Sequence, residues 1–200
     1  MLAKVEGGRR ARKARTREVI LDVAKRLFEE RGYEATTMRD VASAAGIAPG
    51  TIFVHFPDKG SLLIEALLDD FARVDPALFE TMPEGLENRV MHMVGGALDY
   101  WTSRPELSRV MIREMWRVGG EAGARYRAEV RDLVARAAAV LDEAKGREIR
   151  EDVDTTLVAQ SIYDVQTMVL MRHVGDGQLD REAILDEIRR FVRMLTRGIG

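Results

Sequence analysis

The 200-residue chain contains no cysteine, and this absence excludes disulfide bonds, thiolate metal sites and cysteine nucleophiles. It also lacks any run of about 20 apolar residues, the length that a helix needs to span a bilayer. The basic segment that ends at Arg17 is not followed by an apolar stretch, so it does not match a secretory signal. Together these absences predict a cytoplasmic protein that does not insert into a membrane.

Motifs for catalysis are missing too. We find no Gly-rich phosphate loop, no Ser–His–Asp set and no paired-carboxylate motif. His92 and His173 are candidates for metal binding, but His92 has no second ligand at i+3 or i+4 on its helix face. We therefore expect a protein that is not an enzyme and that holds neither a metal ion nor another cofactor.

Charge is unevenly distributed, although the net charge is only −2. Residues 1–60 carry 12 Lys and Arg against 8 Asp and Glu, whereas the other 140 residues carry 19 against 25. A basic amino-terminal part on an acidic body suggests that polyanion binding is confined to one end of the chain. Because the first residues combine Gly7 and Gly8 with a run of Lys and Arg, we expect an arm that is disordered when free. It either lies along a polyanion or is simply solvated.

Apolar residues recur with the period of a helix along the whole chain, and no strand-like alternation appears. In the segment 16–31, Ile20, Ala24 and Leu27 lie on one face, and Gly32 ends the pattern. Further Pro and Gly residues separate the later helical segments. The sequence therefore predicts an all-α chain of about nine helices.

The most informative stretch is residues 36–59. Thr37, with Asp40 three residues later, has the pattern of a capping box that opens a helix. Gly46 follows this helix, and Pro49 suits the first turn of a second, short helix. A helix, a tight turn containing glycine and a second short helix form the helix-turn-helix pattern, whose second helix enters the major groove of DNA.

Residues 50–59, GTIFVHFPDK, resemble the DNA-binding signature of the TetR family of transcriptional repressors, as do Gly32-Tyr33 and Thr36-Thr37. The resemblance covers about residues 16–68. Two departures weaken parts of the pattern. Phe53 stands where the family most often has Tyr, so a phosphate-binding hydroxyl is missing, and Ala48 replaces the usual Ser or Thr cap of the recognition helix.

The resemblance implies a three-helix helix-turn-helix DNA-binding domain at the amino terminus, followed by a helical ligand-binding and dimerisation domain. We accordingly divide the chain into a basic disordered arm, a DNA-binding domain whose motif covers about residues 38–57, and an effector-binding and dimerisation domain: 1–15, 16–75 and 76–200.

The same resemblance implies which residues contact DNA. The residues expected to contact base edges are Met38, Pro49, Gly50, Thr51 and Phe53. Those expected to contact phosphates are Thr37, Phe53 (through its backbone or ring), His55 and Lys59. The basic residues Arg15 and Arg17 are further candidates. For Lys59 there is a physical argument, since a phosphate at the start of the fourth helix would be favoured by both the amides and the lysine. Alternatively, Lys59 is merely exposed and His55 packs beside Phe56.

Large soft and aromatic side chains concentrate in the second domain, with polar residues among them. As effector-binding candidates we name Met91, Trp101, Met111, Glu114, Met115, Trp116, Tyr126, Tyr163 and Gln166. A cavity lined by Met and aromatic residues suits an apolar, adaptable ligand, but the same residues also fill ordinary helical cores. Gly95-Gly96, inside a predicted helix, indicates a bend or a close approach.

The last two predicted helices have broad apolar faces, and in the family these helices pair with those of a second subunit. A homodimer also has a physical reason, because two recognition helices about 34–36 Å apart read a pseudo-palindrome. We therefore predict a homodimeric repressor that binds a double-stranded DNA operator and is released by a small-molecule effector. The alternative is an architectural or effector-independent DNA-binding protein of the same fold.

Overall fold

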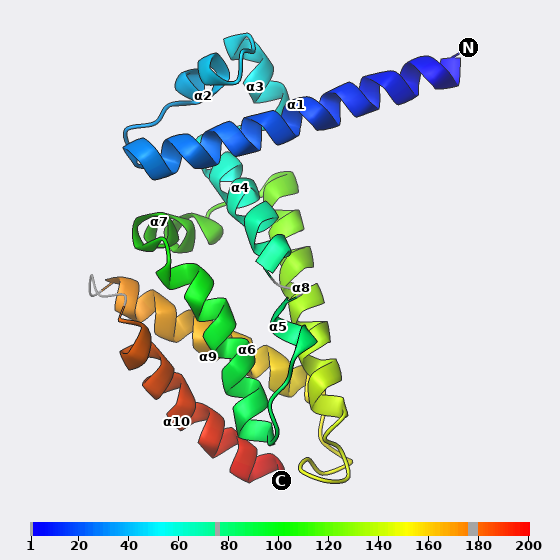
Figure 1. The fold of residues 1–200 in the computed structure, drawn as a ribbon, viewed down its shortest axis with the longest axis vertical. Coiled ribbons are helices and arrows are strands. Elements are labelled where there is room, and N and C mark those ends of the chain that lie inside the picture. The colour runs from blue at the N-terminus through cyan, green and yellow to red at the C-terminus, as the bar shows by residue number, and fades with distance from the viewer. Residues whose placement is uncertain (1, 75–76, 176–179) are drawn as a thin grey trace. The chain divides into compact units, whose positions relative to one another are not determined.

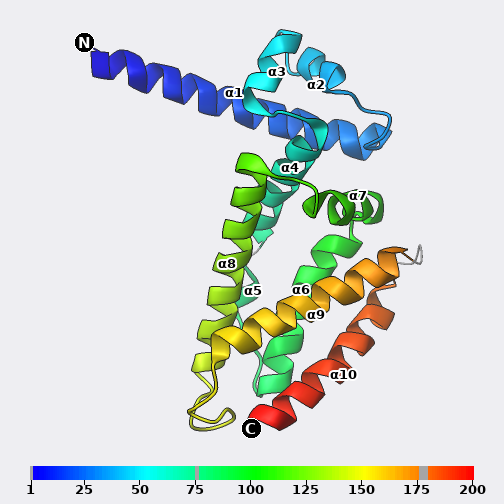
Figure 2. The same cartoon turned by 180° about the vertical axis from the view of Figure 1, so that it is seen from behind.

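The structure is a computed structural model that describes residues 2–74, 77–175 and 180–200. Within these ranges the chain is helical, with one isolated β-bridge between Lys145 and Ile149 and no strand, which confirms the all-α prediction. The helices are α1 (Leu2–Arg31), α2 (Met38–Ala44), α3 (Pro49–His55), α4 (Lys59–Val74), α5 (Ala77–Glu80), α6 (Leu86–Thr102), α7 (Pro105–Met115), α8 (Gly120–Asp142), α9 (Thr155–Gly175) and α10 (Arg181–Ile199) (Figure 1, Figure 2). Short α5 is additional to the predicted helices. The predicted domain boundary, at residues 75 and 76, lies outside the described ranges.

The chain forms two compact units. The first contains Met1–Asp70 and Val110–Tyr126, and the second contains Phe71–Arg109 and Arg127–Gly200. This division differs from the predicted domains, because the family resemblance places residues 110–126 in the effector-binding domain. In the structure Arg113 pairs with Glu34 at 2.8 Å, and Arg125 pairs with Glu65 at 3.1 Å. Ion pairs between residues so distant in sequence cannot be read from local sequence patterns.

In the first unit, α1 is the platform on which the next helices pack. Its buried residues are Ile20, Leu21, Ala24, Leu27 and Phe28. Helix α2 packs against α1, and α3 packs against α2. Burial of a large apolar side chain contributes about 1.5–3 kcal/mol, so this shared core fixes α2 and α3 on one side of α1.

The amino-terminal arm differs from the prediction. The sequence predicts disorder for residues 1–15 and a helix that starts at Thr16, but α1 begins at Leu2 and continues through Thr16 to Arg31. The Thr16 hydroxyl donates to the carbonyl of Arg12 at 3.0 Å, inside the helix rather than at its start. Apart from two glycines, this stretch is rich in Arg, Lys and Ala, which have high helix propensity, and this explains the continuation.

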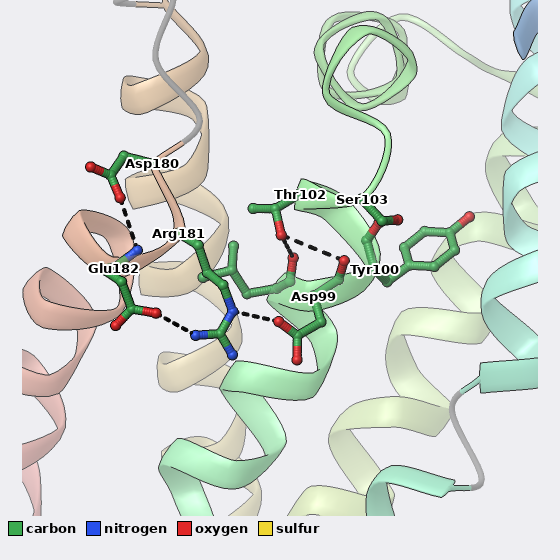
Figure 3. A network of polar contacts seen from close by, with 8 residues as sticks. Asp99, Tyr100, Thr102, Ser103, Asp180, Arg181 and Glu182 are labelled. Atoms are coloured by element: carbon green, nitrogen blue, oxygen red, sulfur yellow. Dashed lines mark hydrogen bonds and ion pairs between the residues drawn. The ribbon is translucent and has the colours of Figure 1, made fainter.

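In the second unit, α10 packs against both α6 and α9. Its buried side chains are Ile184, Leu185, Ile188 and Val192. Polar contacts hold its first turn. Asp180 accepts hydrogen bonds from the amides of Glu182 and Ala183. Figure 3 shows the bond from Glu182 and the contact of Arg181, whose Nε donates to Asp99 of α6 at 2.5 Å. The apolar face of α10, which the sequence assigns to dimerisation, is therefore largely used inside the subunit.

Gly96 marks a close approach, one of the two outcomes predicted for Gly95-Gly96. A β-carbon at position 96 would overlap Cδ2 of Leu78, which belongs to α5. Since α5 packs against α6, a side chain at position 96 would require the Leu78 side chain to move.

Candidate nucleic-acid interface

Local sequence explains the helix-turn-helix geometry. The Thr37 amide donates to Asp40 Oδ2 at 2.9 Å and the Asp40 amide donates to Thr37 Oγ1 at 3.2 Å, which is the predicted capping box. The Thr37 hydroxyl also donates to Asp40 Oδ2 at 2.6 Å, and this bond, together with the one from the Thr37 amide, lowers the pKa of Asp40. Gly46 has φ of 66°, a conformation that favours glycine, and lets the chain turn between α2 and α3. Pro49 is in the first turn of α3, and Ala48 caps it without a side-chain hydrogen bond, as expected.

Helix α3 has one buried side and one exposed side. Ile52 has no exposed surface, and neither has Phe56 directly after the helix. Phe53 and Val54 are 53% and 70% exposed. Pro49 and Gly50 are also exposed, and Thr51 is half-buried. A seven-residue helix that leaves two large apolar side chains in solvent has a surface suited to a partner.

Other predicted DNA contacts lie beside α3. Thr37 is exposed at the start of α2, and Met38, the next residue, is half-buried. His55 is half-buried at the end of α3, and its Nδ1 is buried without a hydrogen-bond partner. Burial lowers the pKa of His55, and the positive charges of Lys13 and Arg17 lower it further. Its ring centre lies 6.4 Å from that of Phe56, so the predicted packing beside Phe56 is present.

Lys59 has partners within its own unit. Its Nζ donates to the carbonyls of Tyr33 at 2.9 Å and Thr36 at 3.1 Å, with Glu34 O at 3.5 Å. It also lies 4.1 Å from the centre of the Tyr33 ring. With its N–H groups directed at carbonyls, Lys59 holds the loop before α2. We therefore revise its predicted role from phosphate contact to support of this loop. Asp58 caps α4 as expected, since the Ser61 amide donates to it at 2.7 Å.

The two arginines predicted at the arm behave differently. Arg15 is exposed, whereas Arg17 is half-buried and pairs with Glu65. The Arg17 guanidinium also lies 5.1 Å from the centre of the Phe56 ring. Glu65 is only 4% exposed and pairs with Arg125 as well. Because its charge is used in this buried pair, Arg17 supports the residues behind α3 rather than presenting its charge to a ligand.

The second unit contains an apolar cavity of about 50 Å³. It is lined by Leu78, Phe79, Val90, Met93, Val94, Ala97, Leu133, Val134, Ala137, Leu141, Ala159, Ile162, Tyr163 and Gln166. Of the nine predicted effector residues, Tyr163 and Gln166 are in this lining. The α8 residues were missed, since a row of Ala, Val and Leu looks like any helical core.

The other predicted effector residues do not join them. Trp101 and Met91, both half-buried in the second unit, do not line the cavity. The rest belong to the first unit: Met111, Glu114, Met115, Trp116 and Tyr126. Among these, Met111 is buried and Trp116 is 65% exposed. Glu114 lines a separate polar pocket of about 430 Å³ with His55 and Asp58. Neither of these two pockets is lined by all nine residues, because the pattern that grouped them was composition rather than contact.

A helix-turn-helix with an exposed recognition edge, in a chain with a second helical unit that encloses an apolar cavity, defines the class of helix-turn-helix transcriptional regulators. The family model of bacterial regulatory proteins, tetR family, matches residues 20–66. The chain is 32% identical over 169 residues to the HTH-type transcriptional repressor AcnR of Corynebacterium efficiens, covering 84% of this chain and 82% of that protein. The chain therefore belongs to the TetR family.

Two further proteins are similar to this chain in sequence or in fold. The repressor KstR of Mycobacterium tuberculosis is 36% identical over 115 residues, or 56% of this chain, and the match spans about half (52%) of that protein. FadR of Bacillus subtilis in complex with stearoyl-CoA has a TM-score of 0.68 at 20% identity, over 88% of this chain and 96% of that one. At this identity the likeness shows a shared fold. KstR and AcnR are transcriptional repressors, which are not enzymes. None of the helices in the described ranges is long and apolar enough to cross a bilayer.

Proposed function

We propose that this protein is a homodimeric, ligand-responsive repressor of the cytoplasm, which binds a pseudo-palindromic operator and is released by a small, largely apolar effector. The exposed side of α3 carries the proposal. Phe53 and Val54 lie in solvent at 53% and 70% exposure, whereas Ile52 beside them is fully buried. An isolated subunit gains nothing from this arrangement, but a recognition helix in the major groove requires it.

The residues around α3 divide by chemistry into base and phosphate contacts. Pro49, Gly50, Thr51 and Phe53, with Met38 at the start of α2, are proposed to face base edges, where apolar atoms meet thymine methyl groups. Thr37, His55 and Arg15 are proposed to contact phosphates, which fix register rather than sequence. Lys59 and Arg17 support this surface from behind, through their bonds to backbone carbonyls and to Glu65.

The cavity of the second unit is the proposed effector site. Its lining is apolar except for Tyr163 and Gln166, which suits a ligand with a long apolar part and one polar end. The stearoyl-CoA complex of Bacillus subtilis FadR supports an acyl-chain ligand. At about 50 Å³ the cavity must open to admit one, so binding changes the surrounding helices. Helix α8 supplies Leu133 and Val134 to the lining and Arg125 to the ion pair with Glu65. It therefore offers a covalent route for coupling, typically about 1–3 kcal/mol.

Dimerisation is proposed through α9 and α10. Although α10 buries its main apolar face inside the subunit, Met194 stays 65% exposed. On α9, Leu157 and Met168 are 64% and 57% exposed, eleven residues apart and so on one helix face. These side chains are the surface that a second subunit would cover.

The proposal is tested with the full chain and a library of random DNA duplexes. Selection is expected to enrich a sequence with two related half-sites about one helical turn apart, or a multiple of this. Fluorescence anisotropy with the enriched duplex, repeated with fatty acids and their coenzyme A thioesters, should then show loss of binding with at least one ligand. If no sequence is enriched over random DNA, the repressor function is refuted. If binding is specific but no apolar ligand affects it, the effector-independent alternative is favoured.

A further inference from the structure

The amino-terminal half of α1 shares a helix face with the core. Residues 10, 13, 17, 20, 24 and 27 follow one another at intervals of three or four, which places them on one side of an α-helix. Ile20, Ala24 and Leu27 are buried and pack the helix-turn-helix. Towards the amino terminus the face changes from apolar to basic, since its next members are Arg17, Lys13 and Arg10.

This basic part of α1 lies beside the recognition helix. Arg17 is the basic residue of this face that lies nearest to the buried residues. It contacts the ring of Phe56, the residue that follows α3. The charges of Lys13 and Arg17 also affect His55, the last residue of α3. Both Arg10 and Lys13 are exposed. In both views, the amino-terminal part of α1 extends past α3 with no other helix of the first unit drawn alongside it (Figure 1, Figure 2).

The composition of this segment indicates what covers it. From Gly8 to Arg17 there are six Lys and Arg and no acidic residue. Like charges three or four residues apart, such as Arg9 and Lys13, destabilise an isolated helix. A row of phosphates relieves this repulsion, whereas an apolar partner would not. An extended polyanion is therefore the complementary ligand.

We propose that Arg10 and Lys13 bind the DNA backbone outside the operator, so that α1 lengthens the contact beyond the bases read by α3. The inference rests on the proposed function, because it takes the duplex held by α3 as its partner. Other exposed arginines of α1 provide a matched control. Arg12 and Arg26 are also exposed, but they lie about a third of a turn or more away from the face that continues the core.

The test uses the full chain with two duplexes, the selected operator alone and the same operator with about 10 flanking base pairs, or one helical turn, on each side. Wild-type protein should bind the flanked duplex more tightly and with a steeper dependence on salt. The double variant Arg10→Gln/Lys13→Gln should lose this gain, with a salt slope smaller by about 0.9 for each phosphate contact removed. The control Arg12→Gln/Arg26→Gln removes the same charge and should retain most of the gain.

The outcomes separate this inference from the proposed function. If wild-type protein binds the selected operator specifically but gains nothing from flanks, or if both double variants lose the same amount, the α1 contact is refuted while the repressor function stands. If no duplex is preferred over random DNA, the repressor function itself fails. Because all four substituted side chains are exposed, circular dichroism should show equal folding of both variants.

Discussion

The ammonium nitrogen of Lys59 lies 2.9 Å from the carbonyl oxygen of Tyr33 and 4.1 Å from the centre of the Tyr33 ring. This contact joins the start of α4 to the loop that precedes α2. Burial, together with the negative charges of Glu114 and Glu34, raises the pKa of Tyr33 to about 12, so its hydroxyl stays neutral in this arrangement. Lys59 thus acts in the DNA-binding unit as a cross-link between two segments.

Lys59→Met is therefore expected to destabilise the protein without removing a phosphate contact. The part-buried carbonyls lose their donor, which should lower the free energy of unfolding by about 1–3 kcal/mol. The melting temperature should fall accordingly. The dependence of DNA affinity on salt should keep its slope. Arg131→Gln, an exposed change in the second unit, controls for the lost charge. A slope smaller by about 0.9 with unchanged melting temperature would return Lys59 to the phosphate contacts.

Substitutions on the exposed side of α3 should weaken DNA binding, whereas substitutions on its buried side should lower stability. Phe53→Ala removes an exposed ring, so thermal stability should be nearly unchanged while binding to the selected operator weakens. Ile52→Ala removes a buried side chain and should cost about 2–5 kcal/mol of unfolding free energy. Thermal melting and anisotropy on the same preparations distinguish the two. Equal operator affinity of Phe53→Ala and wild-type protein would contradict the proposed orientation of α3.

Thr51→Ala should reduce sequence discrimination rather than general affinity. A side chain that meets a base edge contributes about 1–3 kcal/mol to discrimination and adds nothing on random DNA. The measurement is the ratio of affinities for the selected operator and a random duplex. A parallel loss on both duplexes would instead assign Thr51 to the DNA backbone or to folding.

His55 should make stability depend on pH. Its pKa in the folded protein is lower than the ordinary value of 6.5, so the unfolded chain binds its proton more tightly. The contribution of His55 to the free energy of unfolding is therefore fully present above about pH 6.5, and it is lost as the pH falls through the pKa of the folded protein. Thermal melts of wild-type protein and His55→Gln, on both sides of this pH, test the effect. A larger loss of stability on acidification for the variant than for wild-type protein would reverse the assigned sign.

Ala137→Phe should abolish the response to effector and leave operator binding intact. Ala137 lines the apolar cavity and is half-buried, so a ring at this position occupies the space that a ligand needs. Anisotropy with the selected operator, titrated with the active ligand, is the readout. The matched control is Ala139→Phe, an exposed change on the same helix. An Ala137→Phe variant released by ligand as readily as wild-type protein would exclude this cavity.

Local signals predicted the helix-turn-helix well, because its determinants are close together in sequence. The capping box of Thr37 and Asp40, the turn at Gly46 and the first-turn proline of α3 each act within a few residues. The contacts that were not predicted connect segments that are distant in sequence. Nothing near Lys59 in sequence indicates that its acceptors are carbonyls more than twenty residues earlier.

The cavity was predicted from composition, and composition does not state which residues meet. Met and Trp residues were expected to line it, but Trp116 is exposed and Met111 is buried in the first unit. Tyr163 and Gln166 were found because polar groups on an otherwise apolar helix face are unusual. The start of α1 was missed for a related reason, since charge and two glycines outweighed helix propensity in the prediction.

The absence of a side chain at Gly96 has a consequence for evolution. Leu78 both lies against this glycine and lines the cavity, so the position of one residue of the cavity wall depends on the missing side chain. Any mutation there adds at least a methyl group, which must displace the leucine. Relatives that carry alanine at this place would then recognise molecules of a different size, without any change in their recognition helices.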